Sequence, residues 1–147
     1  MQKIVDATMR MMGRAHILLC RIPWIGEPLA RGLSWYMAIF PWLGGVRRTE
    51  SIAETKQHLI DSGEQMGFPF QFSEIEGDQF VLDLPYCPYG FTSSEHRRAC
   101  DTAMDMDRIM LRRCGAELTI TETIPEGAGR CRMLVRQAPK NEVLDPS

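Results

Sequence analysis

Residues 2–20 have the hydrophobic spacing of a helix. Five side chains recur every three or four positions and share one face: Val5, Met9, Met12, His16 and Leu19. A second helix is predicted from about Pro28 to Phe40, because proline suits a first helical turn and Pro41 follows at the end. This second segment is apolar nearly all round, so we expect it to be buried or to lie at an interface.

A third helix is predicted from Ser51 to about Gln65. Ser51 has Glu54 three residues later, which is the pattern of a capping box, and Gly67 marks the stop. Alternating phenylalanine and leucine positions then predict a hairpin with strands at residues 69–75 and 79–84.

The second half of the chain repeats this order. A helix is predicted from Ser93 or Ser94 to about Cys114, and a second hairpin has strands at residues 117–124 and 130–136. The predicted fold is α+β, a four-stranded antiparallel sheet of two hairpins with helices on one face, preceded by N-terminal helices.

Charge divides the chain near residue 48. Residues 1–48 carry seven Lys or Arg against two Asp or Glu, a balance of +5, and the remainder carries ten against seventeen, a balance of −7. The three tryptophans also lie in the basic part: Trp24, Trp35 and Trp42. We therefore expect a basic, Trp-containing helical segment over 1–48, an α-β-β-α-β-β domain over 49–138 and a tail over 139–147.

Partners and location follow from the same features. The uncharged stretch in residues 1–48 is too short to span a bilayer, so this segment is predicted to self-associate or to contact a membrane surface. The net charge of −2 gives no nucleic-acid footprint. Five cysteines without disulfide-scaffold spacing, and no secretory signal, predict a reducing cytoplasmic location, with the membrane periphery as a variant.

Three of the cysteines are predicted to converge. Cys100 lies on the apolar face of the helix ending near Cys114, with Asp107 seven positions later on the same face. Cys131 alternates onto the apolar side of the last strand, and Cys87 follows the second strand. Each thiol could instead be core packing, which is the commoner role of a buried cysteine, and Asp107 could cap a backbone group or pair with an arginine such as Arg132.

Short motifs around these cysteines resemble a known family. They read Tyr86-Cys87-Pro88-Tyr89, Ala99-Cys100-Asp101 and Gly129-Arg130-Cys131-Arg132-Met133. Over about residues 50–136 the chain is similar to the L-2-amino-thiazoline-4-carboxylic acid hydrolase family and, more distantly, to 4-vinyl reductase-like small-molecule-binding domains, some of which bind zinc. The first resemblance implies hydrolytic opening of a small cyclic ring.

The first functional hypothesis is therefore a small hydrolase that opens a cyclic C–N substrate in a Cys-lined pocket. Cys100 or Cys87 would be the thiolate, with Asp107 or His96 for proton transfer. The neighbouring Arg97, Arg98 and helix N-terminus are expected to lower the pKa of the thiol. Four further residues are predicted to contact the substrate: Asp101, Tyr86, Tyr89 and Met104.

Two alternatives remain open at this level. Cys87, Cys100 and Cys131 could hold zinc or an iron–sulfur cluster, although their spacing matches no zinc-finger or ferredoxin pattern. The domain could also be a small-ligand sensor without chemistry, with an apolar pocket between helix and sheet.

Overall fold

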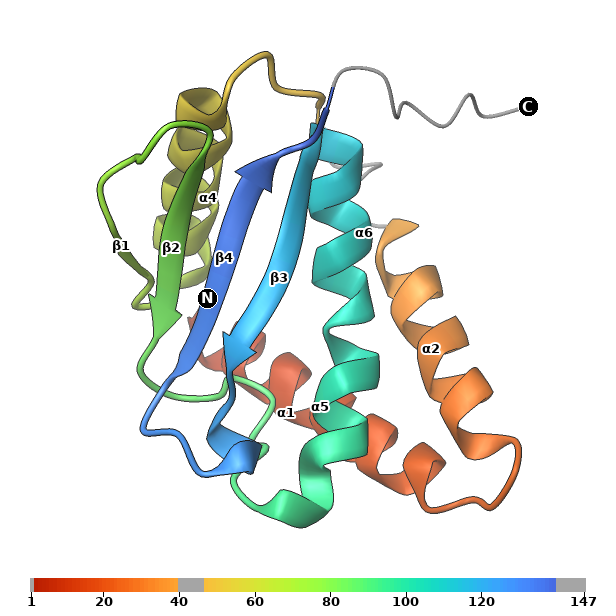
Figure 1. The fold of residues 1–147 in the computed structure, drawn as a ribbon. Helices are drawn as coiled ribbons and strands as arrows, with labels where there is room; N and C mark the ends of the chain where they lie inside the picture. The colour runs from red at the N-terminus through yellow and green to blue at the C-terminus, as the bar shows by residue number, and fades with distance from the viewer. Residues whose placement is uncertain (1, 40–46, 140–147) are drawn as a thin grey trace, which may run out of the picture.

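The computed structural model describes residues 2–39 and 47–139 (Figure 1). The helices are α1 (Gln2–Cys20), α2 (Gly26–Met37), α4 (Ile52–Met66), α5 (Arg97–Ala103) and α6 (Asp105–Cys114), with short 3-10 turns η1 (Ser94–His96) and η2 (Ile124–Glu126). The strands are β1 (Gln71–Phe72), β2 (Gln79–Leu84), β3 (Ala116–Glu122) and β4 (Cys131–Gln137). The end predicted at Phe40, Trp42 and, apart from Pro139, the predicted tail lie outside the described residues.

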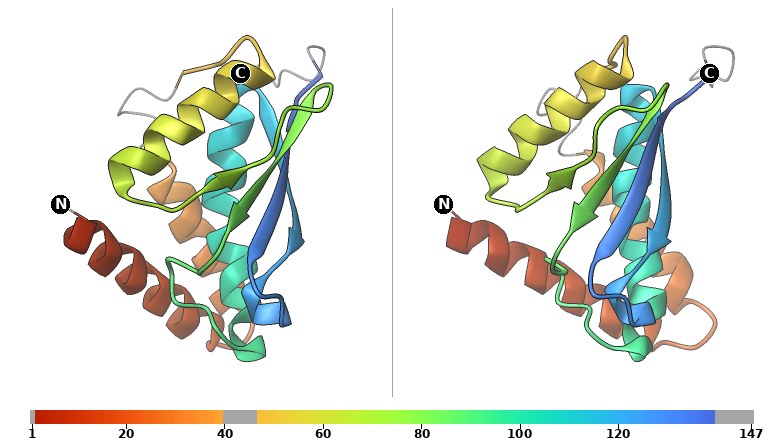
Figure 2. Two further views of the ribbon diagram at one scale, coloured as in Figure 1. Left: turned by 90° about the vertical axis from the view of Figure 1, so that its left-hand side faces the viewer. Right: turned by 60° about the vertical axis from the view of Figure 1, so that its left-hand side comes forward.

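The four strands form one antiparallel sheet in the order β1-β2-β4-β3, which confirms the predicted α+β class. Two hairpins meet where β2 pairs with β4, with Leu82 opposite Met133. Helices α4 and α6 cover one face of the sheet, as the side view in Figure 2 shows. Phe80, Leu82 and Leu84 are buried against that layer, while the residues between them are only partly buried.

Two predicted elements differ in the structure. Strand β1 has two residues instead of the seven predicted over 69–75, because the Ser73 hydroxyl accepts the Val81 amide in place of a backbone carbonyl and ends the regular ladder. The long helix expected to end at Cys114 is interrupted at Met104. Backbone hydrogen bonds from Met104 to Cys100 and from Arg108 to Met104 keep α5 and α6 in continuous contact.

Helix α4 begins at the predicted cap. The Ser51 hydroxyl accepts the Glu54 amide at 3.2 Å, and Gly67, with φ of 73°, closes the helix in the left-handed region. The Glu54 carboxylate accepts the Glu50 amide at 2.8 Å, one residue before the position expected for a capping box. Local sequence signals thus fix both ends of this helix.

The N-terminal helices pack against the helical layer through a buried polar link. His16 of α1 is almost fully buried, and its Nδ1 donates to the Met12 carbonyl at 2.9 Å. Its Nε2 lies 2.9 Å from the Ser34 hydroxyl of α2, which donates to the Thr102 carbonyl of α5 at 2.6 Å. One chain of polar contacts therefore joins α1, α2 and α5, and the division predicted at residue 48 stays a prediction.

Candidate functional site

The three predicted cysteines lie close to one another where the helices meet the end of the sheet. Cys100 is buried in a cluster with Tyr89 and Phe91, and Cys87 packs against that cluster. Cys131 packs against the neighbouring cluster of the sheet. Both Cys87 and Cys131 are near enough to contribute to the raised pKa of Cys100. The fold thus brings together three thiols that are up to 44 positions apart in the sequence.

Burial makes these cysteines thiols and not thiolates. Desolvation raises the pKa of Cys100 to about 12, and it also raises the pKa values of Cys87 and Cys131. The expected lowering by Arg97 and Arg98 was wrong, because their side chains are 70% and 72% exposed and turn to other partners. A cysteine of this kind is a poor nucleophile at neutral pH.

The structure also bears on the metal alternative. Metal ligation requires several ligand side chains around one point. Within residues 2–39 and 47–139, no group of three or more His, Cys, Asp or Glu side chains could hold a metal ion. All five cysteines are free.

Asp107 is an acid that the fold places near the Tyr89 phenol. It lies on α6, and burial raises its pKa to about 7 against small opposing effects from Arg108 and its own backbone amide. The pKa of Tyr89 is raised by burial and then by the proximity of Asp107, Cys87 and Cys100, so all three groups lie near the Tyr89 phenol.

The pairing considered for Asp107 with Arg132 was wrong. Arg132 instead donates two hydrogen bonds of 2.8 Å to Asp83 in the neighbouring strand. In the described part of the chain no cation lies within ion-pair distance of the Asp107 carboxylate. Asp107 therefore has a neutral-range pKa and lacks the partner that would fix it as a carboxylate.

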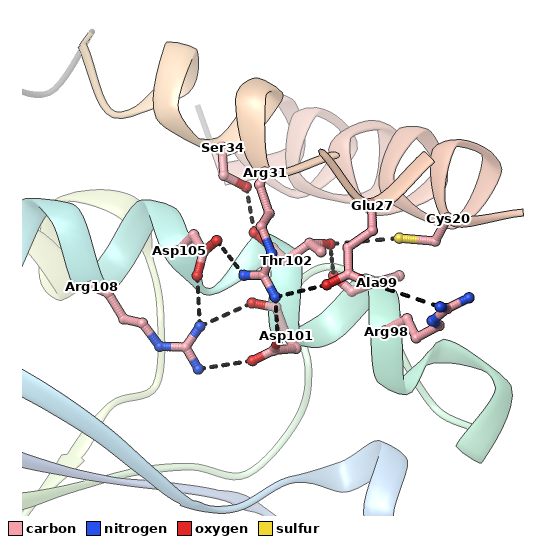
Figure 3. Close-up of polar contacts among 10 residues, drawn as sticks. All are labelled: Cys20, Glu27, Arg31, Ser34, Arg98, Ala99, Asp101, Thr102, Asp105 and Arg108. Atoms are coloured by element: carbon pink, nitrogen blue, oxygen red, sulfur yellow. Dashed lines mark hydrogen bonds and ion pairs between the residues drawn. The ribbon is translucent and has the colours of Figure 1, made fainter. Parts of the chain in front are cut away.

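Asp101 has a different environment from the one predicted for a substrate ligand. One oxygen accepts Arg31 of α2 at 2.9 Å and the other accepts Arg108 at 3.0 Å (Figure 3). Arg31 also binds Asp105 at 2.6 Å and Glu27 at 3.0 Å. Burial opposes ionisation, but the bonds from Arg108 and Arg31 prevail and lower the pKa of Asp101. Asp101 thus serves an ion network that holds α2 to α5 and α6.

Three other predicted residues occupy separate surroundings. The His96 ring accepts the Thr92 amide at 3.3 Å and tilts against Phe91, so it stabilises the loop before α5. Tyr86 is exposed, on the outside of its loop. Met104 is partly buried and packs against both hydrophobic clusters, beside the thiols.

An open depression of about 460 Å³ lies beside the thiols, and the sequence reading missed it. It is formed where the turns before α5 and before β4 meet, by Thr92, Ser94, Arg97, Ile124, Pro125, Glu126 and Gly127. Glu126 contributes to the raised pKa of Cys100, and the Ile124 amide hydrogen-bonds the sulfur of Cys131. The available signals were the Ser-rich cap and the Pro-Glu-Gly turn, which become neighbours only in the fold.

Comparison with known proteins adds no family to this description. No protein-family model matches the chain, and no curated protein matches it. The resemblance to the L-2-amino-thiazoline-4-carboxylic acid hydrolase family therefore stays a prediction based on the short cysteine motifs.

Proposed function

We propose that this protein is a small hydrolase that opens a cyclic C–N substrate, with Asp107 and not a thiolate as the acid–base group. The observation that carries the proposal is a carboxyl group whose pKa burial raises to about 7, near the Tyr89 phenol, which also lies near Cys87 and Cys100. A group with such a pKa can accept and return a proton at neutral pH, which is the requirement for general acid–base catalysis.

The proposed reaction adds one water molecule across the C–N bond. The Asp107 carboxylate takes a proton from water as the water oxygen bonds to the ring carbon. When the C–N bond breaks, the protonated Asp107 gives that proton to the leaving nitrogen. The added oxygen becomes a carbonyl, and its remaining proton passes through the regenerated Asp107 carboxylate to the same nitrogen. Tyr89 stays protonated because its pKa is raised by burial, so it can donate a hydrogen bond to charge that develops on the substrate.

The cysteines have a supporting role in this proposal. Cys87 and Cys100 pack with Met104 in the same apolar cluster as Tyr89, and they would form a weakly polar wall of the site. Substrate would enter from the depression between the two turns, where Arg97 and Glu126 pair at 2.7 Å. An exposed ion pair of this kind contributes little stability and can open at low cost.

The test is turnover of a panel of cyclic amidines and 2-aminothiazoline carboxylates by four proteins. Asp107→Asn is expected to lower kcat by about a hundredfold or more, because it removes the proton acceptor. Cys100→Ala should keep kcat of the same order, and Asp61→Asn on the exposed side of α4 is the control for losing one carboxylate. Loss of turnover in Cys100→Ala with retained turnover in Asp107→Asn would contradict the proposal.

A second candidate is a small-ligand-binding domain without chemistry. The observation that favours it is the protonated state of the thiols, which makes them packing groups. Saturable binding of panel members with no turnover by the unmodified protein would select this candidate. The free thiols support a reducing compartment for either function, and we propose the cytoplasm.

A further inference from the structure

The outward face of α2 is uncharged. Its exposed large side chains, together with the residue before the helix, are between 49% and 58% exposed: Ile25, Leu29, Trp35 and Tyr36. The charged residues Glu27 and Arg31 lie at the side of this face, 42% and 40% exposed, and belong to the ion network of Figure 3. A surface helix normally has the reverse arrangement, so this face is shaped for contact with something apolar.

The loop between α1 and α2, residues 21–25, is called the elbow here, and it exposes a tryptophan to solvent. Trp24 is 98% exposed, and its φ of 69° makes it the one non-glycine residue with positive φ in the described part of the chain. Bulky residues adopt this conformation at a cost in free energy, and such strain marks functional positions. Ile22, also exposed, lies two residues earlier. The elbow forms a corner of the molecule (Figure 1).

Helix α1, which precedes the elbow, has an apolar line with basic residues beside it. Ile4, Met11 and Leu18 are spaced by seven residues, so they follow one line along the helix, and each is more than 60% exposed. By the same helical spacing the exposed Lys3, Arg10 and Arg14 lie together on one side of that line. Apolar and basic stripes side by side are typical of helices that lie in a membrane interface.

An open groove of about 430 Å³ adjoins the elbow. Ile22, Trp24 and Pro28 supply apolar walls, and three charged residues also line the groove: Glu27, Arg31 and Arg98 of α5, whose side chain is 72% exposed. The nearest acid to Arg98 is Glu27 at 3.8 Å, which is longer than a strong hydrogen bond. An exposed guanidinium above apolar walls suits a phosphate headgroup with its acyl chain below.

We propose that the elbow docks on the surface of an anionic lipid bilayer. Trp24 and Ile22 enter the interfacial layer, and Arg14, Arg21 and Arg98 contact headgroup phosphates. The charge balance of +5 over residues 1–48 favours an anionic surface over a second copy of this chain, because two such basic units repel each other. No helix in the described ranges could cross a bilayer, so the contact is peripheral.

The test is co-sedimentation with lipid vesicles, in which the full chain is compared with its Trp24→Gly variant. The protein should sediment with an equimolar mixture of phosphatidylcholine and phosphatidylglycerol, and far less with phosphatidylcholine alone. Trp24→Gly should weaken partitioning by at least roughly tenfold. Because glycine accepts the positive φ, this variant should also unfold at a higher temperature, which separates lost binding from lost folding. Met66→Ala, an exposed apolar residue on α4, is the control.

Charge is tested with Arg14→Glu and its matched control Arg112→Glu on α6, which is also exposed. Arg14→Glu should weaken binding at least roughly fivefold and Arg112→Glu should leave it unchanged. Equal sedimentation of Trp24→Gly and the unmodified protein, or no sedimentation of either, overturns the proposal. A stable dimer without lipid that Trp24→Gly dissociates also overturns it, in favour of a second copy.

Discussion

Helices α2 and α4 lie in one small protein and arrange their side chains in opposite ways. Helix α4 buries Ile52 and keeps Glu54 and Asp61 in solvent. Helix α2 holds Arg31 in the ion network and keeps Trp35 outward. Both helices pack against the rest of the protein. Packing alone therefore does not require α2 to keep large apolar side chains in solvent. The difference is that α4 exposes polar side chains to water, whereas α2 exposes large apolar ones, for which we propose contact with a lipid surface.

The largest expected effect separates inward from outward aromatic residues. Phe80→Ala removes a ring that is 1% exposed and should lower the free energy of unfolding by about 3–5 kcal/mol, because it leaves a cavity in the sheet core. Trp35→Ala should change it by less than about 0.5 kcal/mol, since that ring contributes little to the core. Urea unfolding of both variants measures this, and a large loss for Trp35→Ala would show that the outer face of α2 is already packed.

The comparison extends to two acids in different surroundings. Glu27 has a cation beside it, whereas Asp107 has a pKa raised by burial to about 7 from its ordinary value near 3.8. The folded state then binds more protons than the unfolded state between those values, so stability should fall as pH rises from about 4 to about 7, by on the order of 2–4 kcal/mol. Above pH 7 this loss is complete.

Asp107→Asn provides the check on that dependence. The variant should be more stable than the unmodified protein at pH 8 and should lose the decline between pH 4 and about 7. Urea unfolding at several pH values measures both. An unchanged pH profile in Asp107→Asn would mean that another group causes the decline.

The next effect concerns the ion network that joins α2 to α5 and α6. Arg31→Ala removes ion pairs to Glu27, Asp101 and Asp105 and leaves Arg108 to compensate two of these acids. We expect a loss of about 2 kcal/mol, smaller than for a fully buried network because Arg31 is 40% exposed. Arg97→Ala, which breaks a single exposed pair, should cost less than about 0.5 kcal/mol. Chemical denaturation measures both losses. Similar losses of unfolding free energy for the two variants would show that the ion network does not hold α2 in place.

The smallest effect is a gain. Trp24→Gly relieves a positive φ and should raise the free energy of unfolding by about 1 kcal/mol, because the unstrained backbone outweighs the added freedom of glycine in the unfolded chain. Thermal unfolding without lipid measures the gain. A loss of stability would show that packing of the Trp24 indole stabilises the fold by more than its positive φ destabilises it.

The order of elements could be predicted because its signals are local. The start of α4 is marked by Ser51, whose hydroxyl accepts the Glu54 amide. The ends of α4 and α6 are marked by Gly67 and Gly115, because glycine readily adopts the left-handed conformation that closes a helix. The seven-residue spacing of Cys100 and Asp107 likewise assigned both to one face of a helix. The interruption at Met104 and the short β1 depend on contacts between segments, which periodicity does not record.

The charge states of the site could not be predicted from the sequence. Arg97 and Arg98 are near Cys100 along the chain, yet burial decides the pKa of that thiol. The sequence predicts Asp101 as a substrate ligand because its actual partner, Arg31, is 70 positions away and gives no local signal. Residues close in sequence are enough to predict a helix. The pKa of a titratable group depends on the elements that pack against it, which can be distant in sequence.

The most direct test of the account is the ionisation of Asp107 itself. Carboxyl carbon NMR of protein labelled in its aspartates, with Asp107→Asn to assign the signal, measures the pKa of this group in the folded chain. We predict a midpoint of about 7 for Asp107 and a value below the ordinary range for Asp101. A midpoint near 4 for Asp107 would contradict the claim that this carboxyl is the acid–base group of the site.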